Sequence, residues 1–343
     1  MSNEKYIGLD VHQATISVAV MDSVGKVIIE SILETKASTI LEFLAGLRGS
    51  LFVTFEEGTW AAWLYDLLKP HVTDVLVCNP RKIALLKHGN KSDKIDARKL
   101  AERLRLHDLK PVYHGQTGVR MLRELARSYL TVVKDLSRVM NRLRRCIAVG
   151  RSPVPAEMFT ISAIAAEKIP EAGTRRRAEQ LYEQLDLLRH LRQQARRELL
   201  AESRRHAITA KLRQIPSLGP IRSALAVALI QTPHRFRSKR QLWTYSGLGL
   251  ETRDSGEYHY VQGQVRRRKK QATIRGLNKD YNHDLKGVFK GAATRASVKP
   301  GPFQEFYQRS LAKGIKPTMV RLTLARKIAA ITLTLWKKGE SIN

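Results

Sequence analysis

Four acidic side chains in the first hundred residues have types and positions that suit phosphoryl transfer. Asp10 and Glu56 each end an apolar, β-branched run, so both carboxylates can emerge on the same edge of one sheet. Asp93 and Asp96 are three residues apart in a helical pattern and project from one helix face. Phosphoryl transfer uses such carboxylates to hold two divalent ions about 4 Å apart. The pattern predicts a divalent-metal cluster if the helix packs beside the sheet.

The glutamate at the end of the second run is doubled, so Glu57 competes with Glu56 for the ligand role. Glu56 directly follows apolar Phe55, just as Asp10 directly follows apolar Leu9. Because strand side chains alternate between faces, this shared position favours Glu56. An isolated acid at a strand end is commonly a turn former, and a DxxD pair is commonly a solvated helix face. The combination of all four acids carries the prediction.

The elements that must position these acids alternate between strands and helices. Residues 5–33 contain three apolar runs separated by short turns, which predicts a β-meander. Ser92 can cap a helix that carries Asp93 and Asp96. The other elements expected here are a helix over 38–48, a strand over 51–55, a helix over 59–68 and a strand over 75–78. This order predicts a mixed sheet flanked by helices.

The rest of the chain reads as mainly helical. Residues 118–148 and 174–204 are long Arg- and Leu-rich periodic stretches, which predict a helical hairpin or coiled coil that serves as a spacer or dimerisation arm. Residues 212–230 have the layout of a helix-hairpin-helix. Its glycine turn exposes backbone N–H groups that suit a phosphate, although an ordinary helical turn is the competing interpretation. Residues 278–293 and 303–336 are expected to be helices that pack in a core.

The charge is strongly positive and unevenly distributed. The 343 residues carry a formal charge of +30, for which nucleic acid is the default partner. Residues 1–80 hold five Lys and Arg against ten Asp and Glu, whereas residues 81–343 hold 56 basic and 21 acidic side chains. An acidic module in a nucleic-acid protein suggests bound divalent metal, with a merely solvated acidic domain as the alternative.

Cysteine usage and hydropathy favour a cytoplasmic protein, which we expect to be nucleoid-associated because nucleic acid is its expected partner. Cys78 and Cys146 form neither a metal-ligand spacing nor a disulfide framework. The first residues lack the pattern of a signal peptide, and no run of about 18 apolar residues occurs, so we expect no membrane partner.

Several motifs together resemble a known family. YIGLDVH, VTFEEGTWAAWLY, VCNPRK and especially NKSDKIDARKLAE resemble the RuvC-like domain of the DEDD insertion-sequence transposases, now called bridge-RNA-guided recombinases. IPSLGPIRSALAVALI, LWTYSGLG and TRDSGE resemble the C-terminal transposase domain of that family. The likeness covers nearly the whole chain apart from the central helices. In this chain the segment after the Ser-Gly is longer and more basic than the short serine-rich stretch of some members.

The resemblance implies roles, cofactors and partners. Asp10, Glu56, Asp93 and Asp96 would be the metal ligands, Mg²⁺ the cofactor and Ser255 the nucleophile. The implied partners are donor and target DNA, a noncoding bridge RNA and further copies of the chain, as a dimer or tetramer. The implied domains are a RuvC-like, RNase-H-like α/β domain over 1–112, a helical coiled-coil or dimerisation region over 113–207, and a mainly α-helical transposase domain over 208–343 with the helix-hairpin-helix and the serine.

Ser255 lies in a polar segment with many basic residues, where a lone Ser beside Gly is commonly only a turn residue. Arg253, His259 and the basic run over residues 266–270 could bind the scissile phosphate. Asp254 or a carboxylate of the other domain could accept the proton. The residues expected to contact nucleic acid are Gly219, Arg222, Arg253, Arg266, Arg267, Arg268, Lys269 and Lys270.

Three functions compete on these observations. The first is a strand-exchange enzyme that excises and inserts an insertion sequence. The second is a RuvC-like nuclease that uses the four acids with water as the nucleophile and leaves Ser255 idle. The third is a non-enzymatic nucleic-acid scaffold, which explains the charge but makes the four-acid set a coincidence.

Overall fold

Two units make up the chain, which we describe from a computed structural model. By internal contacts they are Met1–His114 and Gly115–Asn343, and each has its own apolar core. The three-part division expected from the sequence, with boundaries after 112 and 207, stays a prediction. The structure describes residues 3–79, 92–112, 117–148, 169, 171–253, 258–262, 264–267 and 273–339.

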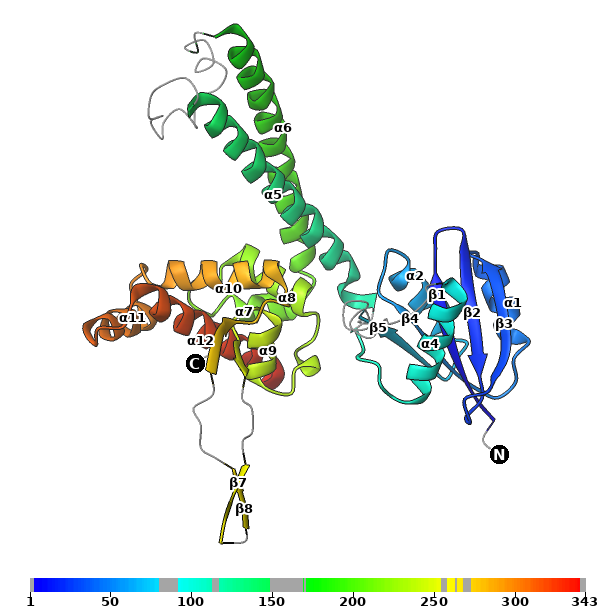
Figure 1. Cartoon of the computed structure of the whole chain (residues 1–343). Helices are drawn as coiled ribbons and strands as arrows, with labels where there is room; N and C mark the ends of the chain where they lie inside the picture. Colours follow the sequence, from blue (N-terminus) through cyan, green and yellow to red (C-terminus); the bar gives the residue numbers. More distant parts are fainter. Residues whose placement is uncertain are drawn as a thin grey trace. The chain divides into compact units, whose positions relative to one another are not determined.

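The first unit is built on one five-stranded mixed sheet with the order β3-β2-β1-β4-β5 (Figure 1). Neighbours among β1, β2 and β3 are antiparallel, whereas β4 runs parallel to both β1 and β5. The three interior strands, β2, β1 and β4, are largely apolar and buried, as expected for strands that are covered on both sides. The strands are β1 (Glu4–Val11), β2 (Thr15–Met21), β3 (Val27–Glu34), β4 (Ser50–Glu56) and β5 (Asp74–Cys78).

Helices cover both faces of this sheet. One face carries Ile7 and Val53, which pack in the same core as Leu44 and Leu64 of α1 and α2. The opposite face carries Tyr6, which packs with residues of α4. The helices are α1 (Ala37–Ala45), α2 (Ala61–Leu68) and α4 (Asp93–Arg105). The predicted mixed sheet flanked by helices is therefore confirmed.

The second unit begins with a short 3₁₀ turn, η1 (Thr117–Val119), and the two long helices α5 (Arg120–Ala148) and α6 (Ala172–Ser203). These helices lie side by side as the predicted hairpin (Figure 1). They share a core of their own, which includes Leu143 of α5 and Leu185 of α6.

Shorter helices form the main core of the second unit around α8 and α12. The most deeply buried side chains include Leu212, Phe289 and Ile328, each fully buried. The helices are α7 (Ala207–Leu212), α8 (Pro220–Ile230), η4 (Pro233–Arg235), α9 (Lys239–Tyr245), α10 (His283–Ala296), α11 (Pro302–Ala312) and α12 (Pro317–Lys338). The predicted helical C-terminal region is confirmed. Among the described helices, none has the length and apolarity that a bilayer crossing requires.

Two small antiparallel ribbons interrupt this helical unit, a feature that the sequence interpretation missed. The ribbons pair β6 (Leu250–Arg253) with β9 (Thr273–Leu277), and β7 (Tyr258–Val261) with β8 (Gln264–Arg267). The first two residues of the basic run over 266–270 lie in a strand. The ribbon of β7 and β8 contains β-branched and aromatic residues, which favour strands. Gln262, whose φ is +52°, lies between its two strands.

Candidate metal centre and basic surfaces

The sheet of the first unit brings the ends of β1 and β4 together. These strands are parallel, and Leu9 pairs with Phe55. Both of these side chains are buried in the core under α1 and α2. Because side chains alternate along a strand, the next residues, Asp10 and Glu56, project toward the opposite face at the same edge of the sheet.

The helix α4 lies directly on that opposite face. A Cβ atom added at Gly8 would stand 2.1 Å from the carbonyl oxygen of Ala97 and 2.5 Å from the backbone nitrogen of Ala101, so only glycine allows this approach. Ser92 begins the helix as predicted, and its Oγ accepts a hydrogen bond from the Ile95 N–H at 3.3 Å. The start of α4, with its two aspartates, is thereby brought to the end of β1.

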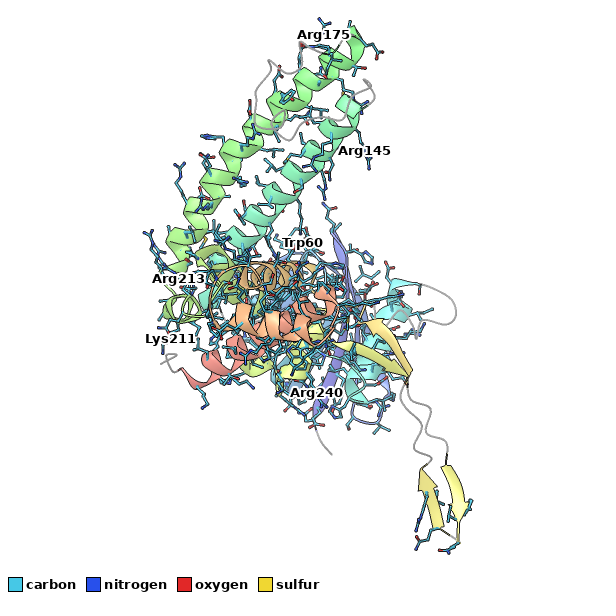
Figure 2. All side chains as sticks on the ribbon, turned by 90° about the vertical axis from the view of Figure 1, so that its left-hand side faces the viewer. Trp60, Arg145, Arg175, Lys211, Arg213 and Arg240 are labelled. Carbon is cyan, nitrogen blue, oxygen red and sulfur yellow. The ribbon has the colours of Figure 1, made fainter. Side chains whose placement is uncertain are left out.

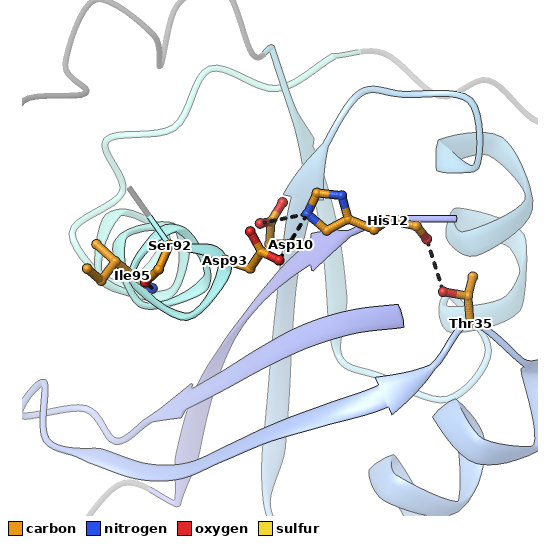
Figure 3. Close-up of polar contacts among 6 residues, drawn as sticks. All are labelled: Asp10, His12, Thr35, Ser92, Asp93 and Ile95. Carbon is orange, nitrogen blue, oxygen red and sulfur yellow. Dashed lines mark hydrogen bonds and ion pairs between the residues drawn. The ribbon is translucent and has the colours of Figure 1, made fainter. Parts of the chain in front are cut away.

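Three potential ligands meet at this point (Figure 3). The Nε2 atom of His12 lies 3.3 Å from Oδ2 of Asp10 and 3.6 Å from Oδ2 of Asp93. One ligand atom from each of the three residues lies within 4.8 Å of the others. His12 is held in place through its backbone, because its carbonyl accepts a hydrogen bond from Thr35 Oγ1 at 3.0 Å and its N–H donates to the Thr15 carbonyl at 2.9 Å.

The electrostatics of Asp10 agree with this convergence of acids. Burial raises the pKa of Asp10, and the negative charges of Asp93 and Asp96 raise it further. His12 opposes the rise through its charge and its hydrogen bond. Neighbouring carboxylates that disfavour the ionised form of Asp10 favour the binding of a cation at this position.

The donor set fits a divalent metal ion. Carboxylate oxygens are the preferred ligands of Mg²⁺, and imidazole nitrogen is a common ligand of transition metals such as Mn²⁺ and Zn²⁺. The structure brings Asp10 and Asp93 within reach of one ion, and it places Asp96 close enough to act on Asp10. The part of each residue in metal binding stays a prediction.

The two candidate glutamates differ in their backbone positions. Glu56 is the last residue of β4 and pairs with Cys78 of β5. Glu57 lies just beyond the strand, and its N–H donates to the Cys78 carbonyl at 2.9 Å. The sheet register thus gives Glu56, and not Glu57, the face and edge that Asp10 occupies.

The sequence interpretation did not include His12 in the site. Its signal was the spacing of two residues from Asp10, which the turn after β1 converts into contact between the two side chains. A histidine two residues after a strand-end aspartate carries little information until the turn conformation is known.

Two helices flank the turn around Gly219, where the sequence predicts a helix-hairpin-helix. The first ends at Leu212 and not at Ile215, and the motif itself stays a prediction. Helix α7 is followed by a turn in which Ser217 has a φ of +72°, and α8 then begins with Gly219 at the N-cap and Pro220 in the first turn. Arg222, one turn into α8, donates from Nη1 to the Ser217 carbonyl at 3.3 Å. Backbone N–H groups at such a helix start suit an anion.

Three of the other basic residues expected to contact nucleic acid lie in the two ribbons. Arg253 ends β6 and Arg267 ends β8, and the side chain of Arg266 on β8 is exposed. Tyr260, on the paired strand β7, is 78% exposed, so the same ribbon presents an exposed aromatic ring as well as the exposed Arg266. The predicted nucleophile and the remaining basic residues, namely Ser255, Arg268, Lys269 and Lys270, lie outside the described residues.

The hairpin of α5 and α6 also presents basic side chains. Arg145 on α5 and Arg175 on α6 are among those labelled on it (Figure 2). Some arginines of these helices pair with acids one turn away, as Arg138 does with Asp135 and Arg189 with Asp186. These local pairs support the helices by a few tenths of a kcal/mol each.

Comparisons with known proteins agree with both parts of this description. Residues 7–149 match a family model for a DEDD domain described as "Transposase", and residues 209–308 match a model described as "Transposase IS116/IS110/IS902 family". The chain is similar to the insertion element IS116 uncharacterized 44.8 kDa protein of Streptomyces clavuligerus. The two are 24% identical over 329 residues, which span 79% of this chain and 78% of that protein.

The chain has a mixed sheet with acids gathered at one edge, in a region that matches a DEDD-domain model. Its helical unit matches a second transposase model. Together these features define a DEDD-type transposase. The chain belongs to the IS116/IS110/IS902 family of insertion-sequence transposases. Enzymes of this class cut and recombine DNA.

Proposed function

We propose that this transposase excises and inserts its insertion sequence by metal-dependent strand cleavage and exchange, with Ser255 as the nucleophile and a noncoding bridge RNA as the guide. The observation that carries the metal-dependent part is the approach of Asp10 and Asp93 at the edge where β4 ends in Glu56. The strand order of the first unit, three antiparallel strands followed by two parallel ones, supports an RNase-H-like domain.

Asp10, Glu56, Asp93 and Asp96 would hold Mg²⁺ in this proposal. Bound divalent ions supply positive charge to the attacking and leaving oxygens of a phosphoryl transfer. His12 contacts two of these carboxylates and orients them, in the way that residues behind a metal ligand commonly do. The turn backbone that fixes His12 therefore also contributes to the site.

Ser255 would form a covalent ester with the DNA. Its oxygen attacks the phosphorus of a phosphodiester, the bond from phosphorus to one sugar oxygen breaks, and that sugar leaves as a hydroxyl. The ester conserves the bond energy, so a second strand can rejoin without ATP. Basic residues near Ser255, Arg253 and Arg266 among them, would stabilise the charge of the pentacovalent transition state.

A RuvC-like nuclease is the second candidate, because the same acid cluster also suits attack by water. We expect Ser255→Ala to lose both cleavage and the covalent adduct, whereas a water mechanism leaves cleavage intact. Denaturing electrophoresis of labelled DNA separates the two. Thr252→Ala is the matched control, since it removes a hydroxyl from the same segment. Robust cutting by Ser255→Ala would exclude the serine mechanism and favour the nuclease.

The guide RNA and the oligomer need their own measurements. We expect RNA from a structured noncoding region beside the gene to co-purify with the full-length protein, and sequencing of that RNA tests this. Light scattering of the purified complex measures whether the assembly is a dimer or a tetramer. Co-purified RNA that is a random sample of cellular transcripts would contradict a dedicated guide.

A further inference from the structure

A cavity of about 530 Å³ in the second unit is lined by basic side chains from two distant segments. The turn between α7 and α8 contributes one wall, and the end of α10 with the residues that follow contributes another. No Asp or Glu is among its lining residues. The four cations that line it are Arg213, Arg222, Arg295 and Lys299.

Contacts with two elements hold the Arg222 side chain at the wall of the cavity. A Cβ at Gly291 of α10 would stand 3.2 Å from Nε and Nη2 of Arg222, so the glycine leaves room for the guanidinium to lie close against that helix. The bond from Nη1 to the Ser217 carbonyl ties the same group to the α7–α8 turn. The guanidinium is therefore positioned by two elements before any ligand arrives.

No carboxylate of the described residues pairs with the charges in this cavity. Burial lowers the pKa of Arg222, and the positive charge of Arg295 lowers it further. Within the described part of the chain, none of the four cations forms an ion pair with a carboxylate. Like charges gathered beside a partly buried guanidinium raise the free energy of the site unless an anion enters.

We infer that this cavity binds a phosphodiester group of the nucleic-acid backbone. Guanidinium groups hold phosphate oxygens through paired N–H donors, and the start of α8 adds backbone N–H groups at the same wall. Arg295, near the end of α10, and Lys299, just after that helix, would contact the same phosphate from the other wall. The inference rests on the proposed function, because that function supplies the nucleic acid.

The slope of binding affinity against salt concentration tests this assignment. Each phosphate contact contributes about 0.9 to the slope of log K against log salt for duplex DNA, and about 0.7 for single strands. We expect Arg295→Gln and Lys299→Gln to make the slope of the full-length protein shallower by about that amount. Lys290→Gln is the matched control, because Lys290 is an exposed residue of α10 that does not line the cavity. Fluorescence anisotropy with a labelled random-sequence DNA duplex and with a single-stranded RNA gives the slopes.

The two probes identify the source of the phosphate, since a change with only one of them assigns the cavity to that nucleic acid. Equal slopes for Arg295→Gln, Lys299→Gln and Lys290→Gln, whether all lowered or all unchanged, would overturn the assignment while leaving the proposed function intact. A wild-type protein that binds neither probe would overturn the proposed function and the cavity together. Circular dichroism checks that the variants, all at exposed positions, keep the fold.

Discussion

Glu56 and Glu57 provide a test of the site at the scale of single residues. Glu56 ends β4 in register with the end of β1, whereas Glu57 lies beyond the strand. We expect Glu56→Gln to lower the cleavage rate by about 10²–10³-fold, the usual cost of removing one preorganised electrostatic group, and Glu57→Gln to stay near the wild-type rate. A cleavage assay on both variants measures the difference. The reverse pattern would move the ligand role to Glu57.

The raised pKa of Asp10 gives a prediction about stability. Because burial and neighbouring acids raise this pKa in the folded state, the stability contribution of Asp10 is present below its unfolded pKa and is lost as the pH rises through the folded pKa. In excess chelator, we therefore expect Asp10→Asn to be more stable than wild type at neutral pH, within the range of about 0.5–2 kcal/mol that single stabilising substitutions reach.

Thermal unfolding as a function of pH measures this difference. The advantage of Asp10→Asn should shrink as the pH falls into the ordinary carboxyl range, where wild-type Asp10 is protonated as well. The variant should also lose cleavage, because the amide cannot serve as an ionised ligand. An Asn variant that is less stable than wild type at neutral pH would contradict the proposed strain among the acids.

At the scale of elements, the contact between β1 and α4 decides whether the aspartates meet. Gly8 leaves no room for a side chain, since a Cβ there would overlap the backbone of α4. We expect Gly8→Ala to lower the free energy of unfolding by about 1–3 kcal/mol and to shift Asp93 away from Asp10, with loss of cleavage. Thermal unfolding and a cleavage assay measure both effects.

Gly58→Ala is the control for that substitution. Gly58 lies in the same unit, but a Cβ at this position would meet no atom within 4 Å. Its stability should therefore stay within about 0.5 kcal/mol of wild type, as for most surface changes. A Gly8→Ala protein that matches Gly58→Ala in stability and cleaves normally would show that the close approach of α4 to β1 is not required.

At the scale of the whole molecule, the uneven charge distribution predicts that nucleic-acid binding and strand cleavage depend on different residues. Residues 1–80, in which acids outnumber bases, supply Asp10 and Glu56 of the proposed metal cluster, whereas residues 81–343 hold 56 of the 61 basic side chains. We expect Asp93→Ala to abolish cleavage while its affinity for DNA stays near that of wild type, since phosphate contacts supply most of the binding. Anisotropy and cleavage assays on the same preparation test this, and cleavage by wild type in excess chelator would refute the metal requirement.

The sequence by itself determined the class of fold and the acids of the candidate site. Apolar alternation predicted the sheet, a capping serine predicted the start of α4, and 3.6-residue periodicity predicted the long hairpin. These signals act between residues that are close in the chain, so they can be recognised without knowing the tertiary structure. The four strands of the two ribbons were not predicted, because their short segments contain few aliphatic residues and so carry little apolar alternation.

Only the tertiary structure decided which side chains meet. The turn after β1 brings His12 onto Asp10 and Asp93, although 81 residues separate His12 from Asp93 in the chain. The packing of α10 beside α8 places Arg295 with Arg222, and Gly291 leaves room for the Arg222 guanidinium beside α10. Local patterns cannot specify such meetings, because they depend on how closely two backbones approach and on the conformation of the turns that join them.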